Sequence, residues 1–190
     1  MPEAAAARPA EGLFAPPRAV REVADLFANI WQLGYVTTDL DRAVKSLSER
    51  HGLEHVVRVP SGGAQFFKGD QPAPFEARFA MAARGGLIVE LIEPVAGEVG
   101  FYRDALPADG SFAVALHHLA MFIPTGDQEW ERLLEVLAAA GLRADYTFLI
   151  PGRVRAAYVD TRAELGHFIE VCQLERDDLE FFNGLTADSA

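Results

Sequence analysis

Residues 116–127 read LHHLAMFIPTGD, and they match residues 30–41, which read IWQLGYVTTDLD. Each stretch has the pattern of a short apolar strand that carries a polar side chain near its start and ends in a turn with threonine and aspartate. Each leads into an amphipathic helix that ends at a glycine, Gly52 in the first copy and Gly141 in the second. The match predicts two copies of one structural module.

The segments that follow the two glycines also correspond. Residues 53–59 (LEHVVRV) and 142–150 (LRADYTFLI) each predict one strand. Residues 75–94 and 153–174 each predict two strands joined by a turn that contains glycine. Each half of the chain therefore has the order βαβββ. We predict an α+β fold in which two tandem βαβββ modules form one cupped mixed sheet around a shared cavity.

The remaining segments divide the chain into parts. The N-terminus is rich in alanine and proline, which is typical of a flexible lead-in. The expected parts are a flexible lead-in at 1–28, the first module at 29–96, a connector with one short helix around Tyr102 at 97–114, the second module at 115–174, and a C-terminal helix and tail at 175–190.

Composition excludes several classes of function. The 190 residues carry a net charge of −11, and clustered Lys and Arg of the kind that bind nucleic acid are not found. No apolar stretch approaches the roughly 20 residues of a membrane span. The single cysteine, Cys172, excludes an internal disulfide and is typical of a reducing compartment. We therefore expect a cytoplasmic protein that binds a small-molecule substrate.

Alternation along the strands predicts which polar side chains point into the cavity, because neighbouring residues face opposite sides of a sheet. Gln32 shares a face with Gly34 and Val36, and His118 occupies the matching place in the second module. We therefore expect His118 to face the cavity and His117 to face the helix side.

Two glutamates are expected to join Gln32 and His118. Glu90 shares a face with Ile88 and Ile92, and Glu170 lies at the matching place in the second module. Burying two lone carboxylates would cost several kcal/mol, and a divalent metal ion would offset that cost. Oxygen and nitrogen ligands of this kind suit nickel, cobalt, manganese, zinc or iron. The alternative is that His118 is a core histidine with ordinary hydrogen-bond partners.

The motifs QLGYVTTDLDRAV, IVELIEPVAGEVGFYRDAL, LHHLAMFI and LGHFIEV resemble the vicinal oxygen chelate superfamily of glyoxalases, bleomycin-resistance proteins and dioxygenases. The resemblance is greatest to its glyoxalase I and methylmalonyl-CoA epimerase-like branch. It implies a homodimer, and one divalent metal ion held by the first and last strands of each module. The metal ligands that it implies are Gln32, Glu90, His118 and Glu170.

The resemblance also implies residues that act on the substrate. The epimerases carry a catalytic glutamate on the third strand of the first module, where this chain has Glu76, and Glu170 is the other candidate base. By strand alternation Arg78 shares the face of Glu76, where it could anchor an anionic group or form only an internal ion pair with Glu76. Alternation also places Tyr158 where it could contact a substrate in the cup or only form part of its wall. Phe66 belongs to the glycine- and proline-rich stretch 59–74, which predicts a loop that could close over a substrate.

The function expected from these residues is that of a metal-dependent lyase or isomerase, which removes a proton next to a carbonyl through a metal-stabilised enolate. A second hypothesis is a drug-binding protein of the bleomycin-resistance type, which uses the same cup without turnover. A third is a ring-cleaving dioxygenase, although a second histidine ligand would then be expected.

Overall fold

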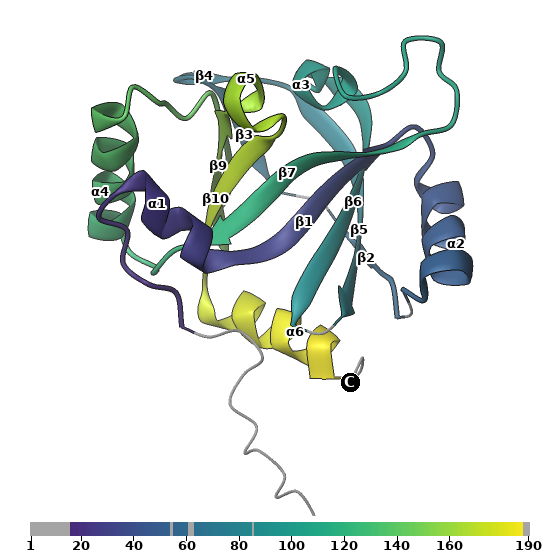
Figure 1. The fold of residues 1–190 in the computed structure, drawn as a ribbon, viewed down its shortest axis with the longest axis horizontal. Coiled ribbons are helices and arrows are strands. Elements are labelled where there is room, and N and C mark those ends of the chain that lie inside the picture. The colour runs from purple at the N-terminus through teal and green to yellow at the C-terminus, as the bar shows by residue number, and fades with distance from the viewer. Residues whose placement is uncertain (1–15, 54, 61–62, 85, 188–190) are drawn as a thin grey trace, which may run out of the picture.

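The computed structural model of the protein describes residues 16–53, 55–60, 63–84 and 86–187. Within them the chain forms one curled, mixed sheet of ten strands with helices outside it and at its ends (Figure 1). The strands are β1 (Ile30–Thr37), β2 (Val57–Val59), β3 (Gln65–Lys68), β4 (Gln71–Pro72), β5 (Phe75–Arg84), β6 (Leu87–Gly97), β7 (Val114–Phe122), β8 (Tyr146–Ile150), β9 (Val154–Asp160) and β10 (Phe168–Leu174). The helices are α1 (Val23–Leu26), the 3-10 turn η1 (Phe27–Asn29), α2 (Leu40–His51), α3 (Gly100–Arg103), α4 (Asp127–Ala139), α5 (Arg162–Leu165) and α6 (Arg176–Ala187).

The sheet contains the predicted repeat. Its strand order is β2-β5-β6-β1 in the first half and β7-β10-β9-β8 in the second. In each half the first strand pairs in parallel with the last, β1 with β6 and β7 with β10. The two halves meet where β1 pairs antiparallel with β7. The α+β fold built from two βαβββ modules around one cupped sheet is therefore confirmed.

The two module helices cover the outer face of the sheet and lie on opposite sides of the molecule (Figure 1). Helix α2 begins at Asp39, whose carboxylate accepts a hydrogen bond from the backbone N–H of Arg42, and it ends at Gly52 in the left-handed conformation. Its apolar face packs Leu40 and Ala43 onto Ala80 and Leu91 of the sheet. Helix α4 makes the corresponding contact in the second module.

The stretch predicted as a lid loop instead contains two strands of the sheet. Strands β3 and β4 form a hairpin, and β3 pairs antiparallel with β8 of the second module, with Phe66 opposite Phe148. Phe66 is buried and stacks on Phe75 at a ring distance of 4.6 Å. Residues 61–62 of this stretch lie outside the described part of the chain. The hairpin thus extends the far edge of the sheet and fixes Phe66 in the core.

Both strands at the junction of the modules carry a β-bulge. The register of β1 against β7 shifts between Ile30 and Gln32, and again between Gly34 and Tyr35. Trp31 is the extra residue at the first shift, and His117 is the extra residue at the second. A bulge inserts one residue on one strand, so two consecutive side chains can point to the same face. Trp31 and His117 occupy equivalent places in the two modules.

The N-terminal segment is packed where the structure describes it. Val20 and Leu26 are buried in the core under α4. Asn29 holds this segment in place, because its amide accepts from the N–H of Arg18 at 3.0 Å and donates to the carbonyl of Arg18 at 2.8 Å. Residues 16–28, which we predicted to belong to a flexible lead-in, thus contact the core in the structure, and residues 1–15 lie outside the described part.

Two helices close the ends of the cup (Figure 1). Helix α3, the short helix expected near Tyr102, places Phe101 and Tyr102 among the aromatic side chains inside the sheet. Helix α6 crosses the opposite end, where Phe182 contacts Trp31 edge-to-face at a ring distance of 5.0 Å. No helix among the described residues has the length and apolar character needed to cross a bilayer.

We expect Phe182→Ala to lower the free energy of unfolding by about 3 kcal/mol, since it removes a buried aromatic contact that holds α6 to the sheet. Phe181→Ala is the matched control: its side chain is 45% exposed, against 7% for Phe182, and its loss should cost about 0.5 kcal/mol. Urea denaturation measures both. Equal, small effects would show that α6 is not held by this contact.

Candidate metal centre

Four polar side chains converge inside the cup, one from each of the four central strands. Gln32, Glu90, His118 and Glu170 are all buried, at 3%, 6%, 0% and 8% exposure. The amide Nε2 of Gln32 donates to Glu90 Oε2 at 2.8 Å. His118 Nε2 lies 3.5 Å from Glu90 Oε2 and 3.2 Å from Glu170 Oε2. The structure thus brings together the four residues that the sequence selected.

Strand register explains the convergence. In the first module Gln32 pairs with Ile88, and Glu90 follows Ile88 by two residues on the same face. The second module repeats this offset, with His118 paired to Phe168 and Glu170 two residues further on. The junction of β1 with β7 then places the two pairs of polar side chains beside each other.

Gly34 makes room for the histidine. It pairs with His118 across the junction, and a Cβ atom at this position would lie 1.9 Å from the imidazole. The ring therefore lies directly over the backbone of β1. Ala120, the equivalent residue of the second module, pairs instead with the flexible Gln32.

His118 and the two glutamates are strongly coupled electrostatically. Burial opposes the charge on His118, but the carboxylates of Glu170 and Glu90 outweigh it and raise its pKa to about 9. Burial also raises the pKa of Glu90, whereas the proximity of His118 and the hydrogen bond from Gln32 act in the opposite direction. His118 Nε2 has no partner with hydrogen-bond geometry among the described residues. A buried nitrogen without a hydrogen bond is unusual and points to a ligand at this place.

The donor set fits a divalent metal ion. One ligand atom each from Glu90, His118 and Glu170 lies within 4.8 Å of the others. Two ligand atoms bonded to one ion at about 2.1 Å are about 3.0–3.5 Å apart in octahedral or tetrahedral geometry, and the observed separations from His118 Nε2 are 3.2 and 3.5 Å. This buried Glu-His-Glu group could therefore bind a metal ion.

Alternation predicted that His117 faces the helix side, and this prediction is wrong. The bulge turns it into the cup, where its ring stacks on Phe168 at 4.7 Å and contacts Tyr102. Its Nδ1 lies 3.1 Å from Nδ1 of His118, and its Nε2 lies 3.2 Å from the carbonyl oxygen of Phe101. Burial lowers the pKa of His117 to about 3, so the imidazole is neutral at ordinary pH.

A cavity of about 270 Å³ opens beside the four polar residues. Gln32, Glu90 and Glu170 form one part of its wall. Its remaining lining is largely apolar and aromatic, and includes Trp31, Phe79, Met81, Phe148, Ile150 and Phe182. Tyr158 also lines it, as expected, and its hydroxyl accepts a hydrogen bond from the hydroxyl of Tyr102 at 2.8 Å. Phe66 is not part of the lining.

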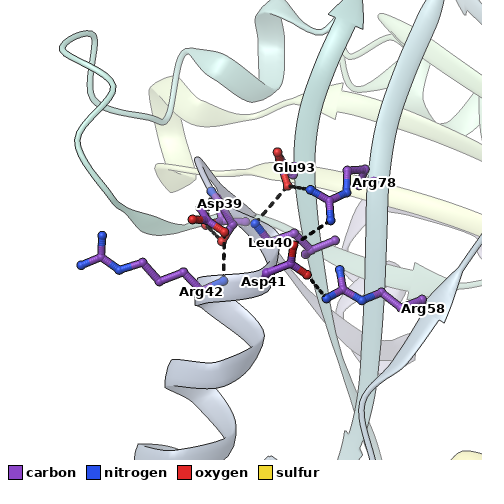
Figure 2. Close-up of polar contacts among 8 residues, drawn as sticks. Asp39, Leu40, Asp41, Arg42, Arg58, Arg78 and Glu93 are labelled. Carbon is purple, nitrogen blue, oxygen red and sulfur yellow. Dashed lines mark hydrogen bonds and ion pairs between the residues drawn. The ribbon is translucent and has the colours of Figure 1, made fainter.

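Glu76 and Arg78 do not face the cavity, so this part of the prediction is wrong. They alternate with Phe79 and Met81, which line the cavity, and they share the outer face with Ala80 under helix α2. Glu76 is exposed. Figure 2 shows that the Arg78 guanidinium lies between Glu93, at 2.9 Å, and Asp41 of α2, at 3.0 Å. Arg78 therefore holds the helix to the sheet.

The sequence did not predict three inward-facing residues, of which Trp31 and Phe182 line the cavity and His117 lies beside His118. Trp31 and His117 face inward only because of the bulges, and the one available signal was that they are equivalent in the repeat. Phe182 was expected on an amphipathic C-terminal helix, but the pattern did not indicate that this helix crosses the cup.

Comparison with known proteins agrees with this architecture. The sequence profile of the glyoxalase/bleomycin resistance protein/dioxygenase superfamily matches residues 31–156. No curated protein matches the sequence. A methylmalonyl-CoA epimerase from Mycobacterium tuberculosis has a similar structure, with a TM-score of 0.52 and 17% identity over 80% of this chain and 91% of that one.

Two further solved structures show the same fold. A hypothetical protein from Bacillus halodurans has a TM-score of 0.52 and 16% identity over 77% of this chain and 94% of that one. A methylmalonyl-CoA epimerase in complex with methylmalonyl-CoA has a TM-score of 0.50 and 20% identity over 78% of this chain and 95% of that one. At these identities the similarity establishes the shared fold.

The raised pKa of His118 predicts how stability depends on pH. The folded protein holds this proton up to about pH 9, whereas an unfolded histidine releases it near 6.5. The free energy of unfolding of the metal-free protein should therefore fall as the pH rises from about 7.5 to about 9, by at most about 1.4 kcal/mol per pH unit. His117, with its lowered pKa, acts in the opposite direction and only below this range.

Urea denaturation in the presence of a chelator measures this slope. The variant His118→Gln should flatten it, and His51→Gln, at an exposed helix end, should leave it unchanged. An equal slope in the wild type and in His118→Gln would contradict the assignment.

Proposed function

The chain belongs to the glyoxalase/bleomycin resistance protein/dioxygenase superfamily, and we propose that it is a metal-dependent isomerase or lyase that moves a proton next to a carbonyl group of a small substrate. The observation that carries the proposal is the buried Glu-His-Glu group, with Gln32 beside it, at the wall of an otherwise apolar cavity. A cup that only held an apolar ligand would have no use for these groups.

Gln32, Glu90, His118 and Glu170 are the residues that would hold the ion. A bound divalent ion would act as a Lewis acid and stabilise the negative charge that develops on a substrate oxygen as the neighbouring C–H bond breaks. The hydrogen bond from Gln32 Nε2 fixes the carboxylate of Glu90. His118 is fully buried over Gly34, so its ring is held in one orientation.

Glu170 is the base in this proposal. Its side chain is 11% exposed, compared with 7% for that of Glu90, and it lines the cavity. Glu170 accepts the proton from the carbon next to the carbonyl and returns it to the same or a neighbouring carbon. Tyr158, which pairs with Glu170 on the neighbouring strand β9, supports the reaction. Because its oxygen accepts from Tyr102, its own proton is free to bind a substrate oxygen.

The cavity favours a substrate whose reacting part is compact and largely apolar. Trp31 and Phe182 wall it on the side of α6, and Phe79 and Phe148 lie on other sides. The charged side chains Arg58 and Arg153 also line it, and both could attract an anionic group. Two classes of substrate are candidates: acyl-CoA thioesters and small hydroxy carbonyl compounds. One of the similar epimerases is in complex with an acyl-CoA thioester.

We expect the purified protein to bind about one divalent ion per chain and His118→Ala and Glu170→Ala to lose it, because both variants remove a ligand. Glu76→Ala, which changes an exposed carboxylate, is the matched control and should keep the ion. Elemental analysis after incubation with nickel, cobalt, manganese, zinc or iron and dialysis gives the occupancy. No bound ion in the wild type under any of these conditions would contradict the proposal.

We also expect the metal-loaded protein to exchange the substrate α-proton for solvent deuterium, with methylmalonyl-CoA and small hydroxy carbonyl compounds as probes. Glu170→Gln should slow the exchange by at least about 100-fold because it removes the base, whereas Glu76→Gln should not change it. NMR follows the exchange. A protein that binds these compounds without exchanging their protons would be a binding protein, and oxygen uptake would indicate a dioxygenase.

A further inference from the structure

His117 is a buried polar residue next to the proposed metal ligands, and the proposed function gives it no role. It is 2% exposed, and its two ring nitrogens face two different partners. Nε2 lies 3.2 Å from the carbonyl oxygen of Phe101, in the connector helix α3, and Nδ1 lies 3.1 Å from Nδ1 of His118. The imidazole therefore bridges the connector and the candidate metal centre.

The carbonyl determines the direction of both hydrogen bonds. A carbonyl oxygen only accepts, so Nε2 of His117 must carry the proton and donate to Phe101. His117 is stacked on Phe168 in a buried aromatic cluster, where a charged ring would be costly. A neutral imidazole with its proton on Nε2 offers Nδ1 as an acceptor. His118 must then donate from its Nδ1, and its Nε2 is left to face Glu90 and Glu170.

We propose that His117 is a positioning residue that keeps a proton on Nδ1 of His118, so that Nε2 of His118 is the nitrogen that loses its proton and binds a metal ion. This inference rests on the proposed function. A ligand histidine whose other nitrogen donates to a fixed acceptor is held in one tautomer and one ring orientation, and it binds metal more tightly. Here the acceptor is a second imidazole, itself fixed by a backbone carbonyl.

The pair of histidines, His117 and His118, occurs only in the second module; the first module has Trp31 and Gln32 at these places. The residue equivalent to His117 is Trp31, whose indole Nε1 donates to Cys172 Sγ at 3.2 Å. An indole nitrogen only donates hydrogen bonds, so Trp31 cannot accept one from a neighbouring metal-ligating side chain. The same bulge thus supplies packing in one module and a hydrogen-bond acceptor in the other.

Two variants separate positioning from packing. His117→Phe keeps an aromatic ring against Phe168 but removes the acceptor, whereas His117→Asn loses the ring but places an amide oxygen where Nδ1 lies. If His117 positions His118, zinc affinity should fall about 10–100-fold in His117→Phe and remain close to the wild-type value in His117→Asn. If His117 only packs, this order should reverse. His51→Phe, at an exposed helix end, is the control.

Zinc affinity is measured by chelator competition, after circular dichroism has verified that each variant is folded. A second readout needs no metal: in protein with ¹⁵N-labelled histidine, NMR should detect scalar coupling between the Nδ1 atoms of His117 and His118 across their hydrogen bond. Absence of this coupling, or unchanged zinc affinity in His117→Phe, would overturn the inference. If the wild type binds none of the five divalent ions but the coupling is present, the proposed function fails while the hydrogen bond between the two histidines stands.

Discussion

The antiparallel pairing of β1 with β7 determines where every polar group of the candidate centre lies. It joins the two modules and carries Gln32 and His118, and it contains both bulges. Without the bulges, Trp31 and His117 would point toward the helices, and the cup would lose both an aromatic wall and the partner of His118. Because the last strand of each module pairs with β1 or β7, the positions of Glu90 and Glu170 also depend on this junction.

The repeat in the sequence was sufficient to predict the modules, the cupped sheet and the four converging side chains. These follow from periodicity and from equivalence between the halves, which are properties of the chain itself. The bulge at His117 was not predictable, because it depends on how two strands 80 residues apart pair, and alternation assumes regular pairing. The β3–β4 hairpin was missed for a similar reason, since its partner β8 belongs to the other module.

The error at Glu76 and Arg78 has a different cause. Both faces of β5 are partly buried, the outer one under α2 and the inner one along the cavity, so apolar content does not tell them apart. Charged residues were expected to face the cavity. In the structure the cavity side carries Phe79 and Met81, and the charges form exposed ion pairs that hold α2. Exposed ion pairs of this kind contribute little stability, so the pairs of Arg78 only add to the apolar packing that attaches α2 to the sheet.

The two modules supply equivalent positions that the chain uses differently. Gln32 and His118 are equivalent, yet the amide donates to a carboxylate while the imidazole lies over the backbone of the opposite strand. This difference requires a glycine opposite the histidine but tolerates Ala120 opposite the glutamine. The same reasoning applies to Trp31 and His117, since Trp31 donates a hydrogen bond to Cys172 and, in our proposal, His117 accepts one from His118. The candidate centre is therefore asymmetric at the Gln32 and His118 positions and at the Trp31 and His117 positions, whereas Glu90 and Glu170 are the same in both copies.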